Sequence, residues 1–348
     1  MIRIGKHEVG REAPPFIIAE LSGNHNGSLD RALEIVDAIA ASGAQALKLQ
    51  TYTADTMTID LAEREFVITN PGSPWFGRDL HSLYKEAHTP WEWHEPLFRR
   101  ARERGLTAFS TPFDGTAVDF LESLGVPAYK IASFENRDLD LIRRVARTGK
   151  PVVISTGLAT LAEIAEAVQA ARGAGCSDLV LLKCTSNYPA APSSSNLRTI
   201  PYLRDLFGCE VGLSDHTLGI AVAIASVAQG AMAVEKHVTL DRAAGGVDSA
   251  FSLEPAELKQ LVESCRMAWE ALGTVQTAPT AEEIPSLVFR RSLYVCSDLG
   301  AGDELTRENL RAIRPGNGLS PKHLQVLLGK RVNRAVPRGT AMSWDLIG

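Results

Sequence analysis

The sequence has no feature that would place the protein in a membrane or on nucleic acid. Its most apolar stretch, residues 220–234, is shorter than the roughly 18 to 20 residues that a membrane span needs, and Gln229 and Gly230 interrupt it. The first ten residues, MIRIGKHEVG, lack the apolar core of a signal peptide. The formal net charge is -5 and charges of both signs are mixed along the chain, so no continuous basic face is available for a polyanion. We therefore expect a cytoplasmic protein with neither a membrane nor a nucleic-acid partner.

Cysteine is scarce, and its spacing excludes the common cysteine-based sites. The five cysteines are Cys176, Cys184, Cys209, Cys265 and Cys296. No two of them form a Cys-x-x-Cys pair, so neither a zinc site nor a dithiol redox site is indicated. We expect reduced residues that serve in packing.

The sequence does contain a regular alternation of short apolar runs and amphipathic stretches, as in repeated βα units. The apolar runs that we expect to be strands are residues 15–23, 46–53, 106–113, 128–133, 151–157, 179–186, 210–216 and 232–238. Eight such units match a (β/α)8 TIM barrel. A doubly wound fold is less favoured, because no Gly-x-Gly-x-x-Gly follows the first strand.

Helical patterns and turn-rich stretches set the expected domain boundaries. The helical patterns include residues 29–44, 91–105, 116–125, 139–149, 161–175 and 257–273, and Thr160 with Glu163 forms a capping box before one of them. Residues 61–90 are predicted to be a long irregular loop that shapes the active site. The alternation ends near residue 273. We expect a catalytic barrel over 1–273, a linker over 274–289 and a small β-rich domain over 290–348.

Polar residues end nearly every predicted strand, where a parallel barrel builds its active site. Lys48 and Lys130 lie inside apolar strands, and a buried lysine is costly unless it is paired. One interpretation is a structural salt bridge with Glu20 or Glu235. A second is that the lysines and nearby serine hydroxyls bind a phosphate or carboxylate. A third makes one lysine a Schiff-base nucleophile.

Two histidines end neighbouring strands, His216 the seventh and His237 the eighth. Alternation along the last strand turns Glu235 and His237 to one face and Lys236 to the other. Such a pair can be structural, can act as general acid and base, or can hold a labile divalent ion. Their position at the expected active-site end favours a functional role.

Seven motifs in order, IIAELSGNHNGSLDRAL, GAQALKLQTYTADTMTID, YKIASFE, ISTGLAT, LKCTSNYPA, GLSDHTLG and VEKHVTLD, resemble the sialic acid synthase family. The resemblance covers essentially the whole chain, and RPGNGL resembles the signature of that family's antifreeze-like SAF domain. LQTYTADTMTID, LYKEAHTPWEWH and DSAFSLEP resemble its pseudaminic acid synthase branch more than its N-acetylneuraminate branch.

The resemblance implies a role for each candidate residue. His216 and His237 match metal ligands, with Mn²⁺, Co²⁺ or Mg²⁺ as cofactor. Lys48, Lys130, Ser133, Ser155, Ser186 and Ser214 match positions that hold phosphoenolpyruvate, although the family commonly has Asn where this chain has Ser186. Gln50, Glu135, Tyr188 and Asp248 match positions around the sugar. Arg314 matches an arginine that reaches the barrel of a second subunit, which implies a domain-swapped homodimer.

The implied reaction condenses phosphoenolpyruvate with 2,4-diacetamido-2,4,6-trideoxy-L-altrose, with C–O cleavage and release of phosphate. Glu135, or otherwise Glu20, is the carboxylate that we expect to take a proton from water, beside His216 and His237. The alternative substrate is a manno-configured amino sugar, as in N-acetylneuraminate or legionaminic acid synthesis. A Schiff-base aldolase and a barrel that only binds sugar are the remaining alternatives.

Overall fold

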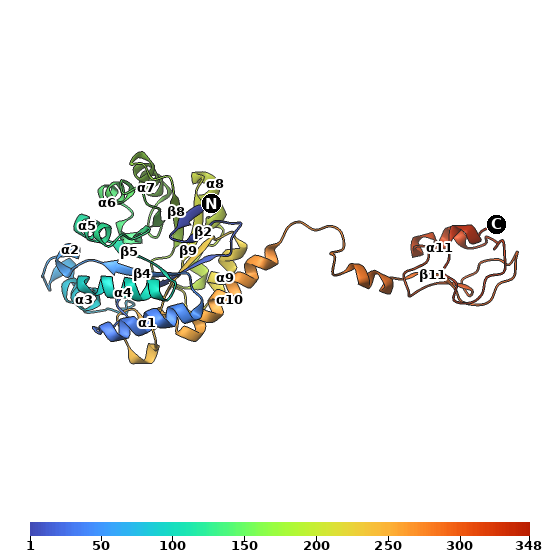
Figure 1. Cartoon of the computed structure of the whole chain (residues 1–348), viewed down its shortest axis with the longest axis horizontal. Coiled ribbons are helices and arrows are strands. Elements are labelled where there is room, and N and C mark those ends of the chain that lie inside the picture. Colours follow the sequence, from blue (N-terminus) through green and yellow to red (C-terminus); the bar gives the residue numbers. More distant parts are fainter. The chain divides into compact units, whose positions relative to one another are not determined.

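The computed structural model describes all 348 residues and divides them into two compact units, residues 1–273 and 274–348. In the first unit eight parallel strands close into a barrel in the order β10-β3-β4-β5-β6-β7-β8-β9 (Figure 1). The strands are β3 (Phe16–Glu20), β4 (Ala46–Thr51), β5 (Thr107–Pro112), β6 (Tyr129–Ile131), β7 (Val152–Ser155), β8 (Leu179–Cys184), β9 (Glu210–Ser214) and β10 (Ala233–His237). The predicted TIM barrel is therefore confirmed, strand by strand.

Helices surround the barrel and pack their apolar faces on the outer side of the strands (Figure 1). They are α1 (Leu29–Ser42), α4 (Trp91–Glu103), α5 (Gly115–Ser123), α6 (Leu139–Ala146), α7 (Leu161–Gly173), α8 (Thr199–Phe207), α9 (Ala221–Ala228) and α10 (Pro255–Leu272). The capping box of Thr160 and Glu163 opens α7, as its sequence predicts. Short 3-10 turns lie at η2 (Ser133–Glu135), η3 (Pro192–Ser194), η4 (Arg242–Ala244) and η5 (Ser249–Phe251).

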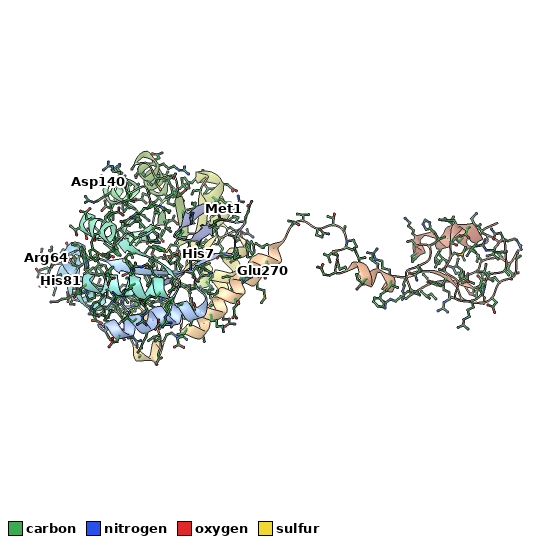
Figure 2. All side chains as sticks on the ribbon, in the orientation of Figure 1. Met1, His7, Arg64, His81, Asp140 and Glu270 are labelled. Carbon is green, nitrogen blue, oxygen red and sulfur yellow. The ribbon has the colours of Figure 1, made fainter.

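Two parts of this unit differ from the prediction. The expected irregular loop over residues 61–90 contains η1 (Arg64–Phe66) and a true helix, α3 (Leu80–Ala87), preceded by α2 (Ala54–Met57). Asp79 starts α3 by accepting a hydrogen bond from the backbone N–H of Ser82. His81, labelled in Figure 2, bonds Asp55 at 2.9 Å and so joins α3 to α2. An unpredicted hairpin, β1 (Ile2–Ile4) and β2 (His7–Val9), has strands too short to show a sequence period.

The second unit has its own small core. It contains η6 (Ile284–Phe289), β11 (Ser292–Val295), β12 (Leu310–Ile313), η7 (Pro321–His323), α11 (Leu324–Leu327) and η8 (Trp344–Leu346). β11 and β12 pair in antiparallel register, and their buried side chains include Leu293, Val295 and Leu310. None of the chain's helices combines the length and the apolar character that a membrane span requires.

The last barrel strand carries a buried lysine behind the cavity. Glu235 and His237 face the barrel interior, whereas Lys236 points away and is fully buried. Its ammonium donates to Asp215 Oδ2 at 3.1 Å and to the carbonyl of Thr217 at 2.5 Å. This pair attaches the end of β10 to the segment that follows β9, and thus helps to set where His216 and His237 lie.

Replacing Asp215 by Ala should lower the free energy of unfolding by about 3 to 5 kcal/mol, because it leaves the Lys236 ammonium buried without a counter-ion. Urea unfolding measures the loss. The double variant Asp215→Ala/Lys236→Met should lose less than the single variant, since the unpaired charge is gone. A single variant as stable as the wild type would contradict a structural role for this pair.

Candidate active site

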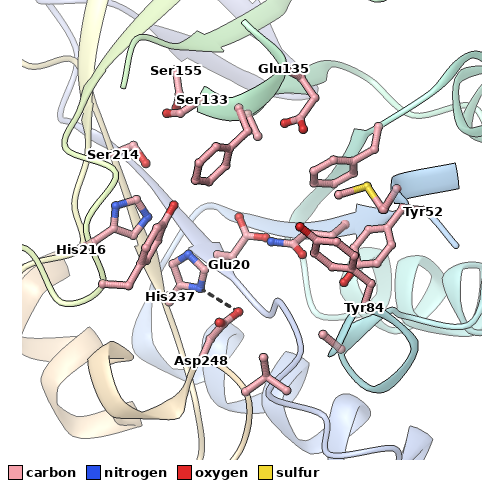
Figure 3. Close-up of a pocket in the computed structure, with 18 of the residues that line it drawn as sticks. Glu20, Tyr52, Tyr84, Ser133, Glu135, Ser155, Ser214, His216, His237 and Asp248 are labelled. Carbon is pink, nitrogen blue, oxygen red and sulfur yellow. Dashed lines mark ion pairs between the residues drawn. The ribbon is translucent and has the colours of Figure 1, made fainter. Parts of the chain in front are cut away.

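A cavity of about 320 Å³ opens at the carboxyl ends of the barrel strands (Figure 3). Twelve of the predicted site residues line it: Glu20, Lys48, Gln50, Lys130, Ser133, Glu135, Ser155, Tyr188, Ser214, His216, His237 and Asp248. They come from strand ends and from the segments that follow them, far apart in the sequence, which the closed barrel brings to one end. The two predicted residues outside this lining are Ser186 and Arg314.

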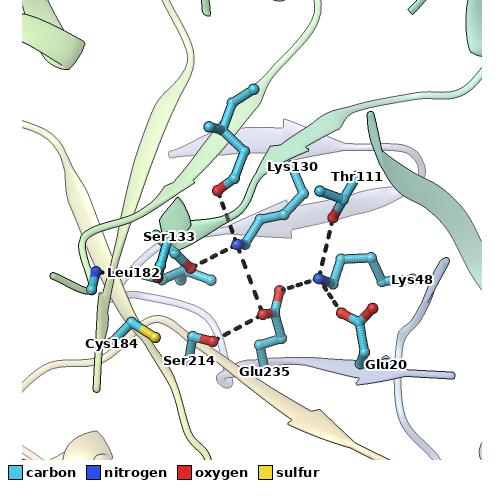
Figure 4. A network of polar contacts seen from close by, with 12 residues as sticks. Glu20, Lys48, Thr111, Lys130, Ser133, Leu182, Cys184, Ser214 and Glu235 are labelled. Atoms are coloured by element: carbon cyan, nitrogen blue, oxygen red, sulfur yellow. Dashed lines mark hydrogen bonds and ion pairs between the residues drawn. The ribbon is translucent and has the colours of Figure 1, made fainter. Parts of the chain in front are cut away.

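The floor of the cavity is a buried network of charges centred on Glu235 (Figure 4). Its carboxylate lies 3.4 Å from Lys48 Nζ and 3.8 Å from Lys130 Nζ, and it accepts a 3.0 Å hydrogen bond from Ser214. Glu20 pairs with Lys48 from the other side. The salt bridges considered from sequence are therefore present, and both ammonium groups also line the cavity.

Burial and pairing act against each other in this network. Burial favours the neutral form of Glu235, but the charges of Lys130 and Lys48 outweigh it and lower the pKa of that carboxyl. For Glu20 burial wins, and the pKa is raised above its ordinary value despite the charge of Lys48. Burial opposes the charge on Lys48, yet Glu20 and Glu235 raise its pKa. A Schiff-base role, which needs a neutral amine, is thus disfavoured for Lys48.

Lys130 differs from Lys48 in that its hydrogen bonds go to neutral oxygens, with Glu235 farther away at 3.8 Å. Its ammonium donates to Ser155 Oγ at 2.6 Å and to the carbonyl of Ile131 at 3.1 Å, and burial lowers its pKa. Lys48 likewise donates to Thr111 Oγ1 at 3.3 Å. Ammonium and hydroxyl donors that converge on the buried floor of a cavity suit a phosphate or carboxylate group.

Gly157, after β7, leaves room for two of the serines. The Ser133 hydroxyl accepts a 3.2 Å hydrogen bond from the Gly157 N–H. A Cβ on Gly157 would lie 2.6 Å from Ser133 Oγ and closer still to Ser186 Oγ. Ser186 itself lines a neighbouring cavity together with Lys183 and Thr199. Only a residue without a side chain fits between the two hydroxyls.

His216 and His237 lie side by side, with ring centroids 5.3 Å apart. Nδ1 of His216 lies 3.1 Å from the carbonyl of Thr185, and because a carbonyl only accepts, this nitrogen carries the proton. Nδ1 of His237 is buried without a hydrogen-bond partner, 3.8 Å from Asp248 Oδ2 (Figure 3). Burial holds the pKa of His237 well below its usual value, so its ring is neutral.

The two imidazole rings of His216 and His237 fit an open divalent-metal site to which the protein contributes two ligands. His237 offers the neutral, unpartnered imidazole nitrogen that binds metal, and the bond from His216 to Thr185 orients the second ring. Burial lowers the pKa of His216, but its hydrogen bond to Cys184 outweighs burial and raises that pKa, so a metal ion at this ring would have to displace its proton. No group of three His, Cys, Asp or Glu side chains is arranged to hold an ion. The arrangement therefore suits a labile ion with positions open to water or substrate, and not a closed structural zinc site.

The sugar-side candidates lie around the histidines. Asp248 is largely buried, accepts a hydrogen bond from Ser22, and has its pKa raised by burial. The Tyr188 ring lies 4.5 Å from that of His216 and 5.7 Å from that of Trp75, centroid to centroid. Glu135 is free of ion pairs within the chain, and burial raises its pKa to about 7 although Lys130 opposes the shift.

Several residues of the site were absent from the sequence-based prediction. Thr111 bonds Lys48 without lining the cavity, lies one residue before the end of β5, and could have been found by the same strand-end rule as its neighbours. Tyr52, Trp75 and Tyr84 come from the long segment after β4, whose path the sequence does not define. Cys184 is free, like the other four cysteines, but it is more than a packing residue. It lines the cavity beside His216, and hydrogen bonding to that ring lowers its pKa to about 7 against the effect of burial.

Arg314 lies in the second unit, directly after β12. Its role at the barrel of a second subunit, and the homodimer which that role requires, stay predictions.

Comparison with known proteins identifies related chains over nearly the whole length. Residues 35–277 match the model of the NeuB family, and residues 290–347 match the SAF domain. A pseudaminic acid synthase of Campylobacter jejuni is 42% identical over 94% of this chain and 95% of its own. An N,N'-diacetyllegionaminic acid synthase of Legionella pneumophila is 38% identical over 95% of this chain and 94% of its own. A solved N-acetylneuraminic acid synthetase of Leptospira borgpetersenii, in complex with citrate, has a TM-score of 0.74 at 32% identity, covering 82% of this chain and 94% of that one.

Replacing Gly157 by Ala should weaken phosphate binding by at least about tenfold, because the new methyl group displaces the Ser133 hydroxyl, which lines the cavity, and the Ser186 hydroxyl behind it. Calorimetric titration with inorganic phosphate measures the change. Gly173→Ala is the matched control, since nothing lies within 4 Å of a Cβ there. Equal affinities for the two variants would rule out anion binding at these serines.

Proposed function

The chain belongs to the NeuB family, and we propose that it condenses phosphoenolpyruvate with a diacetamido sugar to form a nine-carbon 2-keto acid and phosphate. The observation that carries the proposal is that one cavity brings the buried lysines and serine hydroxyls together with the two strand-end histidines. The first set suits a phosphorylated carboxylate, and the second suits an aldehyde that must be activated. The names of the 42% and 38% identical relatives support nonulosonic acid synthesis.

In this reaction the lysines and serines hold phosphoenolpyruvate with its C3 toward the aldehyde of the open-chain sugar. C3 bonds to C1 of the sugar, the aldehyde oxygen takes up a proton, and C2 becomes electron-deficient. Water adds to C2 and loses a proton to a carboxylate. The C2–O bond to phosphate then breaks, phosphate leaves with that oxygen and takes the proton of the new C2 hydroxyl, and the keto group forms at C2.

His216 and His237 would hold the divalent ion that this family is expected to use. Mn²⁺, Co²⁺ or Mg²⁺ bound there would supply a Lewis acid that stabilises negative charge on the aldehyde oxygen. The chain's own contribution is to keep His237 neutral by burial and to orient His216 through Thr185. Asp248, beside His237, is placed to orient the sugar hydroxyls.

The sugar that we propose is 2,4-diacetamido-2,4,6-trideoxy-L-altrose, supported by the pseudaminic acid synthase motifs and by the higher identity to that relative. The alternative is a manno-configured sugar, as in legionaminic acid or N-acetylneuraminate synthesis. The test is phosphate release from phosphoenolpyruvate with Mn²⁺ and three sugars in parallel: the L-altro sugar, its D-manno isomer and N-acetylmannosamine. Turnover with the L-altro sugar alone is expected. Turnover only with a manno sugar would overturn the substrate, and release with none would overturn the reaction.

Replacing His237 by Ala should lower kcat/KM by at least about 100-fold, because even residues that only support a metal ligand typically contribute 10- to 100-fold. Mn²⁺ binding, followed by electron paramagnetic resonance, should weaken in parallel. His7→Ala is the control, since His7 lies on β2 and outside the cavity lining. A His237→Ala enzyme that retains both turnover and Mn²⁺ binding would remove the metal role.

The pH dependence should report the carboxylate that accepts the proton of water. Glu135 has its pKa raised to about 7 by burial, so raising the pH through about 7 converts it to the basic form and kcat/KM should rise. In the Glu135→Gln variant this rise of kcat/KM with pH should disappear. The Glu103→Gln variant is the control: Glu103 is an exposed residue of α4, and its substitution should leave the rise unchanged. If the rise persists in Glu135→Gln and is lost in Glu20→Gln, then Glu20 is the base instead.

A further inference from the structure

The barrel unit buries four lysines, and one of them has no counter-ion. Lys48, Lys130, Lys183 and Lys236 are each at most 7% exposed. Lys48, Lys130 and Lys236 each lie within 4 Å of a carboxylate. Lys183, on β8, makes no ion pair with the rest of the chain. Because a buried ammonium is costly without a negative partner, the charge of Lys183 needs an explanation that the reaction proposed above does not give.

The contacts of Lys183 within the chain leave most of its donors free. Its Nζ donates to Thr185 Oγ1 at 2.5 Å, and that hydroxyl donates in turn to the carbonyl of Ser194 at 3.1 Å. Thr185 therefore accepts one of the three ammonium hydrogens and supplies no negative charge. Burial lowers the pKa of Lys183, and the charges of Cys184 and Asp215 do not offset this effect. An anion from solution would supply what the chain lacks.

Lys183 lines a cavity of about 420 Å³ next to the active-site cavity, which we call the side cavity. Its polar lining consists of Thr156, Lys183, Thr185, Ser186, Ser194 and Thr199, and it includes no acidic residue. Ile164 of α7 and Leu203 of α8 also line it, so the side cavity opens between these two helices and the ends of β7 and β8. The two cavities share Cys184 as a lining residue.

The rim of the side cavity is apolar and carries an unusual backbone conformation. Leu158 lines the cavity, is 69% exposed, and has a φ of 65°, in the left-handed region that residues with a side chain disfavour. Such conformations are kept where a ligand site gains from them. Together with Ala159 and Leu203, this rim leaves room for an organic group beside a charged one.

We propose that the side cavity is a second anion site, in which Lys183 binds a phosphate group, either as inorganic phosphate or as part of a phosphate monoester. A lysine ammonium is a point charge with three donors, which suits a tetrahedral oxyanion. The hydroxyl of Thr199, the first residue of α8, adds a donor on the same lining. The site takes no part in the proposed reaction, and Lys183 is not among the groups assigned to phosphoenolpyruvate.

Calorimetric titration of the full-length chain with inorganic phosphate tests the proposal. The wild type should bind two ions per chain, one in the active-site cavity and one in the side cavity. Lys183→Met keeps the length of the side chain and removes its charge. This variant should lower the affinity of one site by at least about tenfold, the typical contribution of a charged hydrogen bond, and leave the other site unchanged. Lys259→Met is the matched control, because Lys259 is an exposed residue of α10 and lines neither cavity.

Unfolding measurements show whether the variant remains folded. In phosphate-free buffer Lys183→Met should be at least as stable as the wild type, because it removes a buried charge that has no counter-ion. Added phosphate should raise the Tm of the wild type more than that of Lys183→Met, since a ligand of the native state stabilises it.

A Lys183→Met chain that binds as many phosphate ions as Lys259→Met, with the same affinities, would overturn the proposal. If only the active-site cavity fails to bind phosphate, the wild type should bind one ion and Lys183→Met none, which would count against the proposed function and leave the second site standing. A parallel titration with glucose 6-phosphate distinguishes the two sources of the phosphate group. Binding tighter than that of inorganic phosphate, and lost in Lys183→Met, would assign the site to a monoester, and weaker or equal binding would assign it to the free ion.

Discussion

The buried carboxylate of Glu235 is the group around which the site is built. It lies between two lysines from β4 and β6, so one negative charge on β10 positions two positive charges across the barrel. Without it, the two ammonium groups would have only Glu20, which pairs with Lys48, and burial would favour the neutral form of Lys130. With Glu20 the network has two charges of each sign, and an anion that enters adds negative charge to it. The raised pKa of Glu20 makes that carboxyl the member that most easily takes up a proton when this happens.

The same network explains why the site needs a barrel. Lys48, Lys130, Glu235 and Glu20 stand on four different strands, and their contacts form only because the sheet closes on itself. Around this floor the chain places groups of opposite character. The serines, His216 and the neutral His237 line the cavity near the strand ends, and apolar side chains after β4 line it as well. The polar groups of the cavity thus come largely from the strand ends, and most of its apolar side chains come from the segment after β4.

The sequence predicts the strands and the residues at their ends, because these depend on local patterns. It does not predict which side chains pair, because those contacts join residues that are far apart in the sequence. The eight strands follow from apolar runs, and the strand-end rule brings Lys48, Ser155 and His237 to one face without knowledge of any contact. The rule cannot tell that Lys130 is held by Ser155 and Ile131 while Lys48 is held by Glu20, because those partners depend on barrel curvature and side-chain rotamers. The sequence predicts an irregular loop over residues 61–90, because helix α3 within it is only eight residues long and depends on the Asp79 cap. The aromatic residues that it brings to the cavity were missed for the same reason.

The measurement that tests the account most directly follows one oxygen atom. Phosphoenolpyruvate labelled with heavy oxygen at the position that bridges C2 and phosphorus is incubated with the enzyme, Mn²⁺ and the L-altro sugar, and the released phosphate is analysed by mass spectrometry. If water adds to C2 and the C–O bond breaks, the phosphate carries the label. Unlabelled phosphate would mean that the phosphorus–oxygen bond breaks instead, and it would contradict the mechanism derived from this site.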